Sequence, residues 1–408
     1  MDSMSKFVCK HPWSHFEVNN PNGDVTMCCN NDTVLGNVNE GSLSEIWNGP
    51  DFQNMRRRMQ DEGAHAFCPP TCPVLQGGKR YENLDWFTEL RSDGEVRKNA
   101  ELNESEFDQG KVVLDSAPRW LRFTYSYACN LDCYHCYQRE DAKIRRKLPD
   151  SFMEEAKRYS TSAQVIMPFG GEPFFFKPVL DFIDDIEEGG ETRFFFITNG
   201  TILTDRIWRT LERMQISCMA VSLDAATASS YDTLRVRGRN AEWATVMNNL
   251  VRYKQLKETK NFQFTLSMTV NSVNAMEIES FVDLALSLDA EPLILLVANP
   301  DQTMEFHKKF LVFSGADFSE MDAQIERSLS KVRAKGGLSD AETYLEQLRA
   351  VLRQHRDMGN NPLRFAVTNF LRKSARKLPA CVREPLRKVV TKARTKRFEK
   401  YRAGPGAV

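Results

Sequence analysis

Three cysteines within eight residues constrain this chain more than any other feature of its sequence. Residues 129–136 read CNLDCYHC, and they directly follow a strand-like run over residues 120–127. A loop this short can present three thiolates to one inorganic centre, and thiolates favour zinc or an iron–sulfur cluster. A structural zinc site needs four protein ligands, and His135 is the one further candidate nearby. A four-iron cluster held by three cysteines instead leaves one iron open to a small chelating ligand.

Apolar runs alternate with amphipathic segments between residues 119 and 299. Runs such as 194–197 (FFFI) and 293–297 (LILLV) suit parallel strands that are covered on both faces. Repeated strand–helix units imply right-handed crossovers and an α/β barrel or partial barrel, with its chemistry at the carboxyl ends of the strands. We expect strands at 119–126, 164–169, 192–198, 216–223, 262–270 and 292–298, and helices at 151–160, 177–188, 204–214, 240–257 and 275–288.

Short motifs follow successive predicted strands in this stretch. GGEP at 170–173 follows the second strand, TNG at 198–200 ends the third, and SLD at 222–224 ends the fourth. Together with the cysteine loop and Arg235, these motifs resemble the radical SAM superfamily, in the family's order and over residues 119–300. The resemblance implies a partial (β/α)6 TIM-like barrel that reductively cleaves S-adenosylmethionine. The 5′-deoxyadenosyl radical so formed would abstract a hydrogen atom from a substrate.

The resemblance also implies roles for individual residues. Cys129, Cys133 and Cys136 would hold the catalytic 4Fe–4S cluster, and the glycines of the GGEP motif would let backbone approach the cofactor closely. Ser222 and Asp224 would hydrogen-bond the ribose hydroxyls. The residues expected to bind the cofactor are His135, Gly170, Gly171, Glu172, Thr198, Asn199, Ser222, Asp224, Arg235 and Asn271.

Two charged residues are expected to bind the amino-acid end of S-adenosylmethionine. Glu172 would accept a hydrogen bond from its amino group, and Arg235 would pair with its carboxylate. Arg237 and Arg239 are rivals of Arg235 for that role. His135 stands where the family usually carries an aromatic side chain beside the adenine, and a hydrogen-bonded loop histidine is the alternative.

A second group of cysteines lies near the N-terminus, within residues 9–72. The segments 23–28 (GDVTMC), 35–37 (LGN) and 45–48 (EIWN) resemble the SPASM domain, an auxiliary-cluster module of many radical SAM enzymes. That resemblance implies a second 4Fe–4S cluster, closed by four thiolates. A zinc site with the same ligands is the alternative. The implied ligands are Cys9, Cys28, Cys68 and Cys72, with Cys29 as an alternative to Cys28.

The order of these modules departs from the family, in which the SPASM domain normally follows the barrel. The fold class we expect is α/β, with a small N-terminal iron–sulfur domain before the barrel and a helical C-terminal extension after it. Two helices are expected in that extension, at 321–335 and 341–357. The predicted domains are 1–87 (SPASM-like), 88–118 (charged linker), 119–300 (radical SAM core) and 301–408 (helical extension with a basic tail).

Composition sets outer bounds on function. The 408 residues hold 55 lysines and arginines and 55 aspartates and glutamates, so net charge indicates no particular partner. No apolar run approaches the roughly 20 residues that span a bilayer, and residues 1–6 lack the apolar core of a signal peptide. We therefore expect a cytoplasmic location, where thiols stay reduced and clustered cysteines serve as metal ligands rather than disulfides.

Two remaining features are a basic C-terminal segment and two isolated cysteines. Lysine and arginine dominate residues 372–402, and such a tail could contact nucleic acid, an anionic membrane surface or a phosphorylated substrate. We favour a solvated amphipathic helix that packs on the barrel, and we expect no nucleic-acid partner. Cys218 is expected to be a buried core residue, and Cys381 to be incidental.

The sequence therefore predicts a radical SAM enzyme of oxidoreductase or epimerase type, with two 4Fe–4S clusters. The auxiliary cluster would assist substrate oxidation or binding. The partners are a substrate and an external one-electron reductant such as flavodoxin or ferredoxin. A sugar or other small molecule is the favoured substrate, and a ribosomally made peptide or protein is the alternative. A non-catalytic iron–sulfur or zinc scaffold is the rival of another class.

Overall fold

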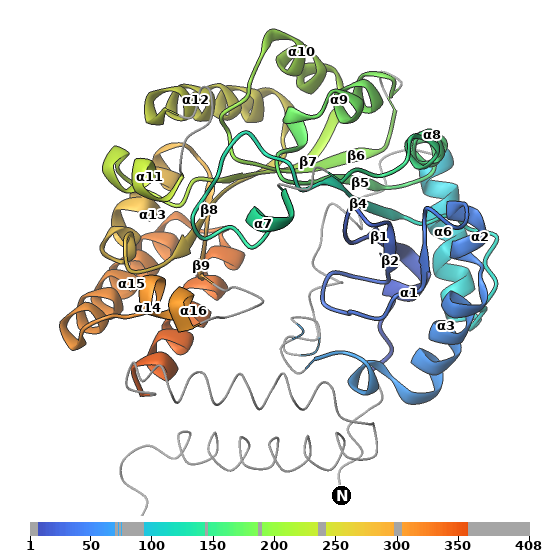
Figure 1. Ribbon diagram of the computed structural model, residues 1–408, viewed down its shortest axis with the longest axis horizontal. Coiled ribbons are helices and arrows are strands. Elements are labelled where there is room, and N and C mark those ends of the chain that lie inside the picture. Colours follow the sequence, from blue (N-terminus) through green and yellow to red (C-terminus); the bar gives the residue numbers. More distant parts are fainter. Residues whose placement is uncertain are drawn as a thin grey trace, which may run out of the picture.

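The computed structural model describes residues 7–69, 72, 75, 94–142, 146–186, 190–235, 242–297 and 304–357 of the chain. These residues hold nine strands: β1 His15–Val18, β2 Asp24–Thr26, β3 Gly36–Asn37, β4 Trp120–Ser126, β5 Val165–Gly170, β6 Arg193–Thr198, β7 Gln215–Ser222, β8 Gln263–Val270 and β9 Glu291–Leu296. The nine form one sheet in the order β3-β2-β1-β4-β5-β6-β7-β8-β9, which arches across the molecule in Figure 1.

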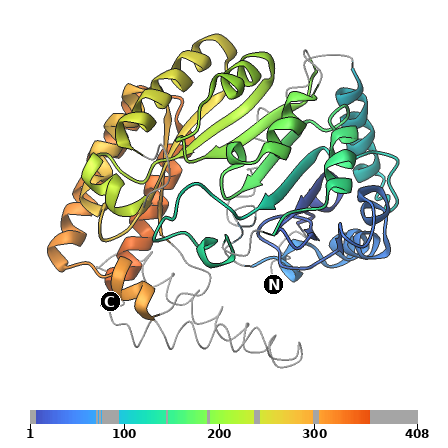
Figure 2. The same ribbon diagram turned by 45° about the horizontal axis from the view of Figure 1, so that its top comes forward.

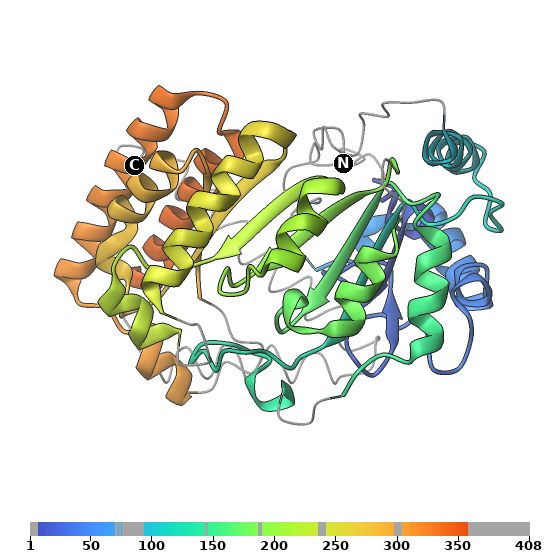
Figure 3. The same ribbon diagram turned by 90° about the horizontal axis from the view of Figure 1, so that it is seen from above.

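Strands β4 to β9 are all parallel to their neighbours, as the apolar runs predicted. Each predicted strand lies within two residues of the observed one, and the partial (β/α)6 barrel is confirmed. Helices follow the strands and cover the outer side of the sheet (Figure 3). They are α8 Asp150–Tyr159, α9 Lys177–Asp184, α10 Asp205–Arg213, α11 Ala228–Leu234, α12 Trp243–Lys260 and α13 Ile278–Ser287. The short helix α7 Arg139–Ala142 follows the cysteine loop and lies on the concave side of the sheet (Figure 1). Two 3-10 turns, η2 Pro173–Phe175 and η3 Ala275–Glu277, complete the connections.

Side chains alternate between the two faces of the sheet. Leu121 and Phe123 of β4 belong to the large core between sheet and helices. Trp120, from the same strand, belongs to a smaller apolar cluster with Val165 and Met167. Because successive side chains of a strand point to opposite faces, this smaller cluster marks the concave inner face of the barrel.

The N-terminal unit joins the barrel sheet instead of standing apart as a separate small domain. Strand β1 pairs in parallel with β4, so that His15 lies opposite Trp120 and Val18 opposite Phe123. Strands β2 and β3 extend this edge in antiparallel fashion. The unit's helices are α1 His11–Ser14, α2 Leu43–Trp47, α3 Pro50–Glu62 and the 3-10 turn η1 Ala64–Ala66.

The segment expected to be a charged linker contains a packed helix, α6 Glu95–Asp108. The amide of Asn103 donates to the carbonyl of Trp13 at 2.6 Å, and the Glu106 carboxylate accepts from the backbone N–H groups of Asp115 and Ser116. Asn103 and Glu106 are buried. Polar residues thus fasten this helix to the N-terminal unit, and composition alone could not reveal that.

Three helices close the other end of the sheet: α14 Met304–Phe310, α15 Gly315–Lys335 and α16 Ser339–Asp357. Helix α16 packs on β9 and α15, as Figure 2 shows on the side opposite the N-terminal unit. Both predicted C-terminal helices are confirmed, whereas the basic segment 372–402 and Cys381 lie outside the described residues. None of the described helices combines the length and apolarity needed to cross a membrane.

Candidate active site and cysteine clusters

The cysteine loop follows β4 at the carboxyl edge of the parallel sheet. Cys129, Cys133 and Cys136 are each partly exposed. The backbone N–H of Leu131 donates to Cys129 Sγ at 3.4 Å. Burial raises the pKa of Cys129 to about 12 and that of Cys133 to about 11, so these thiols become metal ligands only as a metal displaces their protons.

Two glycines of the GGEP motif pack the end of β5 against the start of this loop. A Cβ atom on Gly170 would lie 2.2 Å from the Ser126 carbonyl oxygen, and one on Gly171 would lie 2.1 Å from that of Ala128. Gly170 also has a φ of +144°, which other residues avoid. We expected these glycines to let the backbone approach the cofactor closely. In the structure they let the end of β5 approach the backbone that leads into the cysteine loop.

Glu172 is fully buried beside this edge and is tied to the end of β6. Its carboxylate accepts from Thr198 Oγ1 at 2.8 Å, from Asn199 N at 2.7 Å and from Phe174 N at 3.2 Å. Burial raises the pKa of Glu172 to about 7, and these hydrogen bonds oppose that rise. A carboxylate has about four acceptor positions, so these three hydrogen bonds leave one position unfilled.

The TNG motif at the end of β6 also reaches the cysteine loop. Asn199 Nδ2 donates to Asn130 Oδ1 at 2.9 Å and lies 3.6 Å from Cys129 Sγ. Asn130 Nδ2 in turn donates to Thr201 Oγ1 at 2.8 Å. The loop is thus fastened to the neighbouring strand end by side-chain amides as well as by packing.

Asp224 joins three elements at the end of β7. Its Oδ2 accepts from His135 Nε2 at 2.9 Å and from Arg235 Nη2 at 2.6 Å, while its Oδ1 accepts from both N and Oγ1 of Thr269. Burial alone would raise the pKa of this carboxyl, but Arg235 and His135 hold it well below its usual range. The backbone φ of Asp224 is +60°, a conformation that is uncommon outside glycine.

Two further expected ribose-binding residues have different surroundings. Ser222 is only partly buried, and its hydroxyl accepts from Ser267 Oγ at 3.3 Å. Asn271 is fully buried and closes the turn after β8, where its Nδ2 donates to the Thr269 carbonyl and its N–H to Asn274 Oδ1. The structure brings Ser222 to the strand-end cluster but commits the Asn271 side chain to its own turn. Arg237 and Arg239 lie outside the described residues.

The four N-terminal cysteines are enclosed in the core of their unit. Burial raises the pKa of both Cys9 and Cys68 to about 12, with a further contribution from Cys72. Cys29, unlike its neighbour, is exposed. The exposed fractions are 4% for Cys9, 3% for Cys28, 4% for Cys68 and 5% for Cys72.

Both cysteine groups offer the thiol ligands that iron–sulfur clusters take. Within the described ranges, no three histidine, cysteine or acidic side chains converge as the ligands of a single metal ion would. Three partly exposed thiols in one group and four buried thiols in the other match the donor sets expected for two clusters.

A buried ion pair lies on the inner face next to the N-terminal site. Arg122 Nη1 donates to Glu17 Oε2 at 3.1 Å and to Asn19 Oδ1 at 2.8 Å, and its guanidinium lies 4.4 Å above the Phe169 ring. Glu17 acts electrostatically on the thiol of Cys28. The pairing of β1 with β4 thus places a charged pair between the N-terminal cysteines and the barrel interior.

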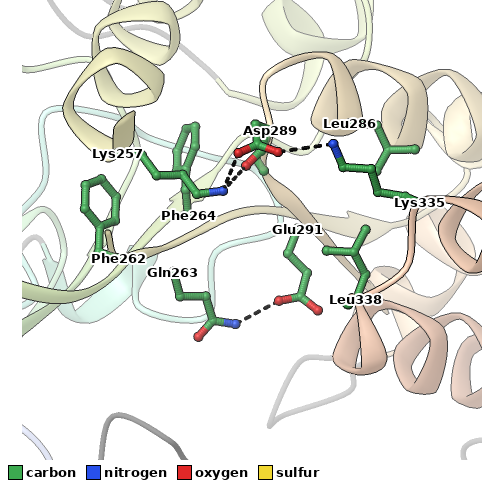
Figure 4. Close-up of a pocket in the computed structure, with 11 residues that line it drawn as sticks. Lys257, Phe262, Gln263, Phe264, Leu286, Asp289, Glu291, Lys335 and Leu338 are labelled. Atoms are coloured by element: carbon green, nitrogen blue, oxygen red, sulfur yellow. Dashed lines mark hydrogen bonds and ion pairs between the residues drawn. The ribbon is translucent and has the colours of Figure 1, made fainter. Parts of the chain in front are cut away.

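A cavity of about 180 Å³ lies elsewhere, at the amino ends of β8 and β9 (Figure 4). Lys257 and Lys335 both approach the carboxylate of Asp289, at 2.8 and 3.4 Å, and Gln263 donates to Glu291 at 2.9 Å. These polar groups satisfy one another, and the cysteine loop is at the opposite ends of the strands. This cavity is not part of the candidate site.

Residues 123–285 match the model of the radical SAM superfamily, and residues 9–73 match that of the SPASM iron–sulfur cluster-binding domain. The chain is 26% identical over 184 residues to an AdoMet-dependent heme synthase of Methanosarcina barkeri, which is 44% of this chain and 50% of that protein. It is 20% identical over 196 residues to a probable GTP 3′,8-cyclase of Sulfurisphaera tokodaii, covering 46% and 60%. The chain thus spans about half the length of these curated relatives.

Solved structures with related folds include Streptococcus suis SuiB, with 13% identity, 69% and 63% of the two chains covered, and a TM-score of 0.42. Native anSMEcpe with bound AdoMet is 16% identical, with 53% and 62% covered and a TM-score of 0.40. Fold, motifs and family model together show that residues 123–285 form a radical SAM domain. The chain carries a SPASM-like domain ahead of it, over residues 9–73, and the two domains imply two 4Fe–4S clusters and S-adenosylmethionine.

Sequence reasoning missed several residues that build the site. Asn130 and Thr269 were assigned no role from the sequence, although each makes a hydrogen bond in the site. Thr269 lies at an inward-facing position of strand β8. Tyr231 was recognised as the first residue of a YxxLR-like segment that ends in Arg235 but was given no role, and its side chain is fully buried. A search for polar residues on inward-facing strand positions would have found Thr269.

Proposed function

We propose that this chain reductively cleaves S-adenosylmethionine at a cluster held by Cys129, Cys133 and Cys136, and that the 5′-deoxyadenosyl radical abstracts a substrate hydrogen atom. When bound, the reduced cluster supplies the electron for that cleavage. The observation that carries the proposal is the convergence of three partly exposed thiols with Glu172 and Asp224 at the carboxyl ends of β4, β5 and β7. A non-catalytic scaffold would not need polar groups fastened around its open side.

The contacts of these acidic residues refine their proposed roles. Glu172 keeps one acceptor position, which suits the amino group of S-adenosylmethionine. All four acceptor positions of Asp224 are taken, so we assign it the role of positioning Arg235 and the cysteine loop. Arg235 remains the partner for the cofactor carboxylate, and Ser222 remains the candidate for the ribose.

For the N-terminal site, we propose an auxiliary 4Fe–4S cluster held by Cys9, Cys28, Cys68 and Cys72. The burial of Cys28 and the exposure of Cys29 favour Cys28 as the ligand. Four protein ligands close such a cluster to substrate. We assign it an assisting role in a net oxidation or epimerisation, in a reducing cytoplasmic setting where thiols remain available as ligands.

The favoured substrate is a small polar molecule, not a peptide. The names of the two curated relatives refer to heme and to GTP, both small molecules. Hydroxyl side chains of β7 and β8, including Ser222, Ser267 and Thr269, lie partly exposed where those strands end. Such a surface can hydrogen-bond hydroxyl-rich compounds such as sugars.

The test is anaerobic incubation of the fully reconstituted chain with S-adenosylmethionine and dithionite. We expect 5′-deoxyadenosine and methionine, with faster formation when a matching sugar or other small molecule is added. Absence of 5′-deoxyadenosine from protein with both clusters would overturn the proposal in favour of a scaffold. Stimulation by peptides alone would transfer the substrate assignment to a ribosomal product.

A further inference from the structure

Among the residues that the structure describes, Tyr231 Oη and Arg235 Nε are buried beside the cysteine loop without a hydrogen-bond partner. His135 Nδ1, within the loop, also lacks one. Tyr231 is fully buried and Arg235 is 8% exposed. Folded proteins rarely leave a buried donor unpaired, so such atoms often mark a partner that is absent from the coordinates.

The backbone holds both residues against the middle of the loop. Tyr134, which follows Cys133, donates its N–H to the Leu234 carbonyl at 3.3 Å, and the N–H of Arg235 donates to the Tyr231 carbonyl at 2.8 Å. Asp224 Oδ2 then binds Arg235 Nη2 and so limits where the guanidinium can turn. Helix α11 therefore presents its last turn to Cys133.

Electrostatic coupling identifies the same neighbour. Arg235 lies close enough to the Cys133 thiol to act on it electrostatically, and so does Tyr231. The two unpaired donors and this one cysteine thus form a single local group.

We propose that Tyr231 Oη and Arg235 Nε donate hydrogen bonds to sulfur at the Cys133 corner of the cluster and thereby raise its reduction potential. This inference rests on the proposed function, because it requires a cluster in the loop. Reduction adds negative charge to the cluster, and donors aimed at its sulfur atoms stabilise the reduced form more than the oxidised one. Tyr231 and Arg235 act here as positioning and tuning residues.

The test compares Tyr231→Phe with Tyr253→Phe in the full, reconstituted chain. Both tyrosines are fully buried, and neither hydroxyl has a hydrogen-bond partner in the described part of the chain. Tyr253 interacts electrostatically with Glu172 and Arg252, whereas Tyr231 interacts with Cys133. The readout is a redox titration followed by electron paramagnetic resonance. The loop cluster is identified as the signal that changes when S-adenosylmethionine is added.

We expect Tyr231→Phe to lower the reduced-to-oxidised ratio about fivefold at a fixed potential, as for the loss of one hydrogen bond. That is about 40 mV for a one-electron couple. Tyr253→Phe should leave the potential unchanged. Equal potentials in Tyr231→Phe and the unmodified protein, or equal shifts in both variants, would overturn the inference.

Arg235→Lys separates hydrogen bonding from charge, since lysine keeps the positive charge but has no Nε. We expect this variant also to lower the potential, and an unchanged potential would remove Arg235 Nε from the proposal. Iron content separates the two levels of failure. If the loop binds no cluster, the proposed function and this inference fall together. If a cluster forms and responds to S-adenosylmethionine but ignores Tyr231, this inference alone is wrong.

Discussion

The four cysteines of the N-terminal site are between 3% and 5% exposed, whereas the three of the loop are only partly buried. The first group lies inside the packed core of its unit, and the second lies on a rim where parallel strands end. The number of thiols and their exposure agree. Four buried thiols suit a closed centre, and three at an edge suit a centre with room for a small molecule. Access therefore supports, alongside ligand count, the proposed division between an auxiliary and a reacting centre.

The largest expected effect tests which centre reacts. The triple replacement Cys129→Ala/Cys133→Ala/Cys136→Ala should abolish 5′-deoxyadenosine formation and reduce iron from about 8 to about 4 atoms per chain. Iron analysis and chromatography of the products measure the two effects. Zinc in place of iron, or no iron left after the triple replacement, would eliminate the auxiliary cluster.

The matched replacement at the other site is Cys68→Ala/Cys72→Ala. Iron should again fall by about 4 atoms, but cleavage of S-adenosylmethionine should persist because the loop centre is intact. Loss of cleavage in a chain that retains the loop cluster would contradict the proposal that this cluster alone cleaves S-adenosylmethionine.

The next prediction decides whether Cys28 or Cys29 is the fourth ligand of the N-terminal site. Cys28→Ala should lose the auxiliary iron, about 4 atoms per chain, because Cys28 is buried in the site. Cys29→Ala should keep it, because Cys29 is exposed. The same iron analysis distinguishes them, and the reverse pattern would make Cys29 the ligand.

At the open site, Asp224→Asn should destabilise the fold. It leaves Arg235 buried without its ion partner, and breaking such a pair costs about 3–5 kcal/mol. Asp181→Asn is the control, because its pairs with Lys177 and Arg206 are exposed and worth below about 1 kcal/mol. Chemical unfolding of the full chain measures the loss of stability in both variants. Equal losses would contradict the role of Asp224 in positioning Arg235.

The smallest effect concerns pH. The pKa of Glu172 is about 7 in the folded chain and 4.5 ordinarily, so the folded state holds its proton more tightly between these values. Stability should therefore fall as pH rises from about 4.5 to about 7, by up to about 3 kcal/mol. The Glu172→Gln variant should not show this pH-dependent fall in stability in unfolding curves recorded across that range. An identical slope in both proteins would show that Glu172 does not titrate there.

The barrel was predictable because its strands are nearly continuous apolar runs, such as 194–197 in β6. The motif positions were predictable because their residues follow those strands. The pairing of β1 with β4 was not, since it joins residues about a hundred positions apart and leaves no local pattern. The contact of Asp224 with Arg235 and His135 was also missed, because each residue had been assigned separately to the cofactor.

The parallel pairing of β1 with β4 fixes how the two cysteine-bearing parts of the chain are spaced. A domain on a loose tether could drift relative to its neighbour. Here the hydrogen-bonded register prevents such drift, because His15 lies opposite Trp120 at the spacing of adjacent strands. A longer or shorter connecting segment would leave this register unchanged, so the separation of the two proposed cluster sites is set by the sheet.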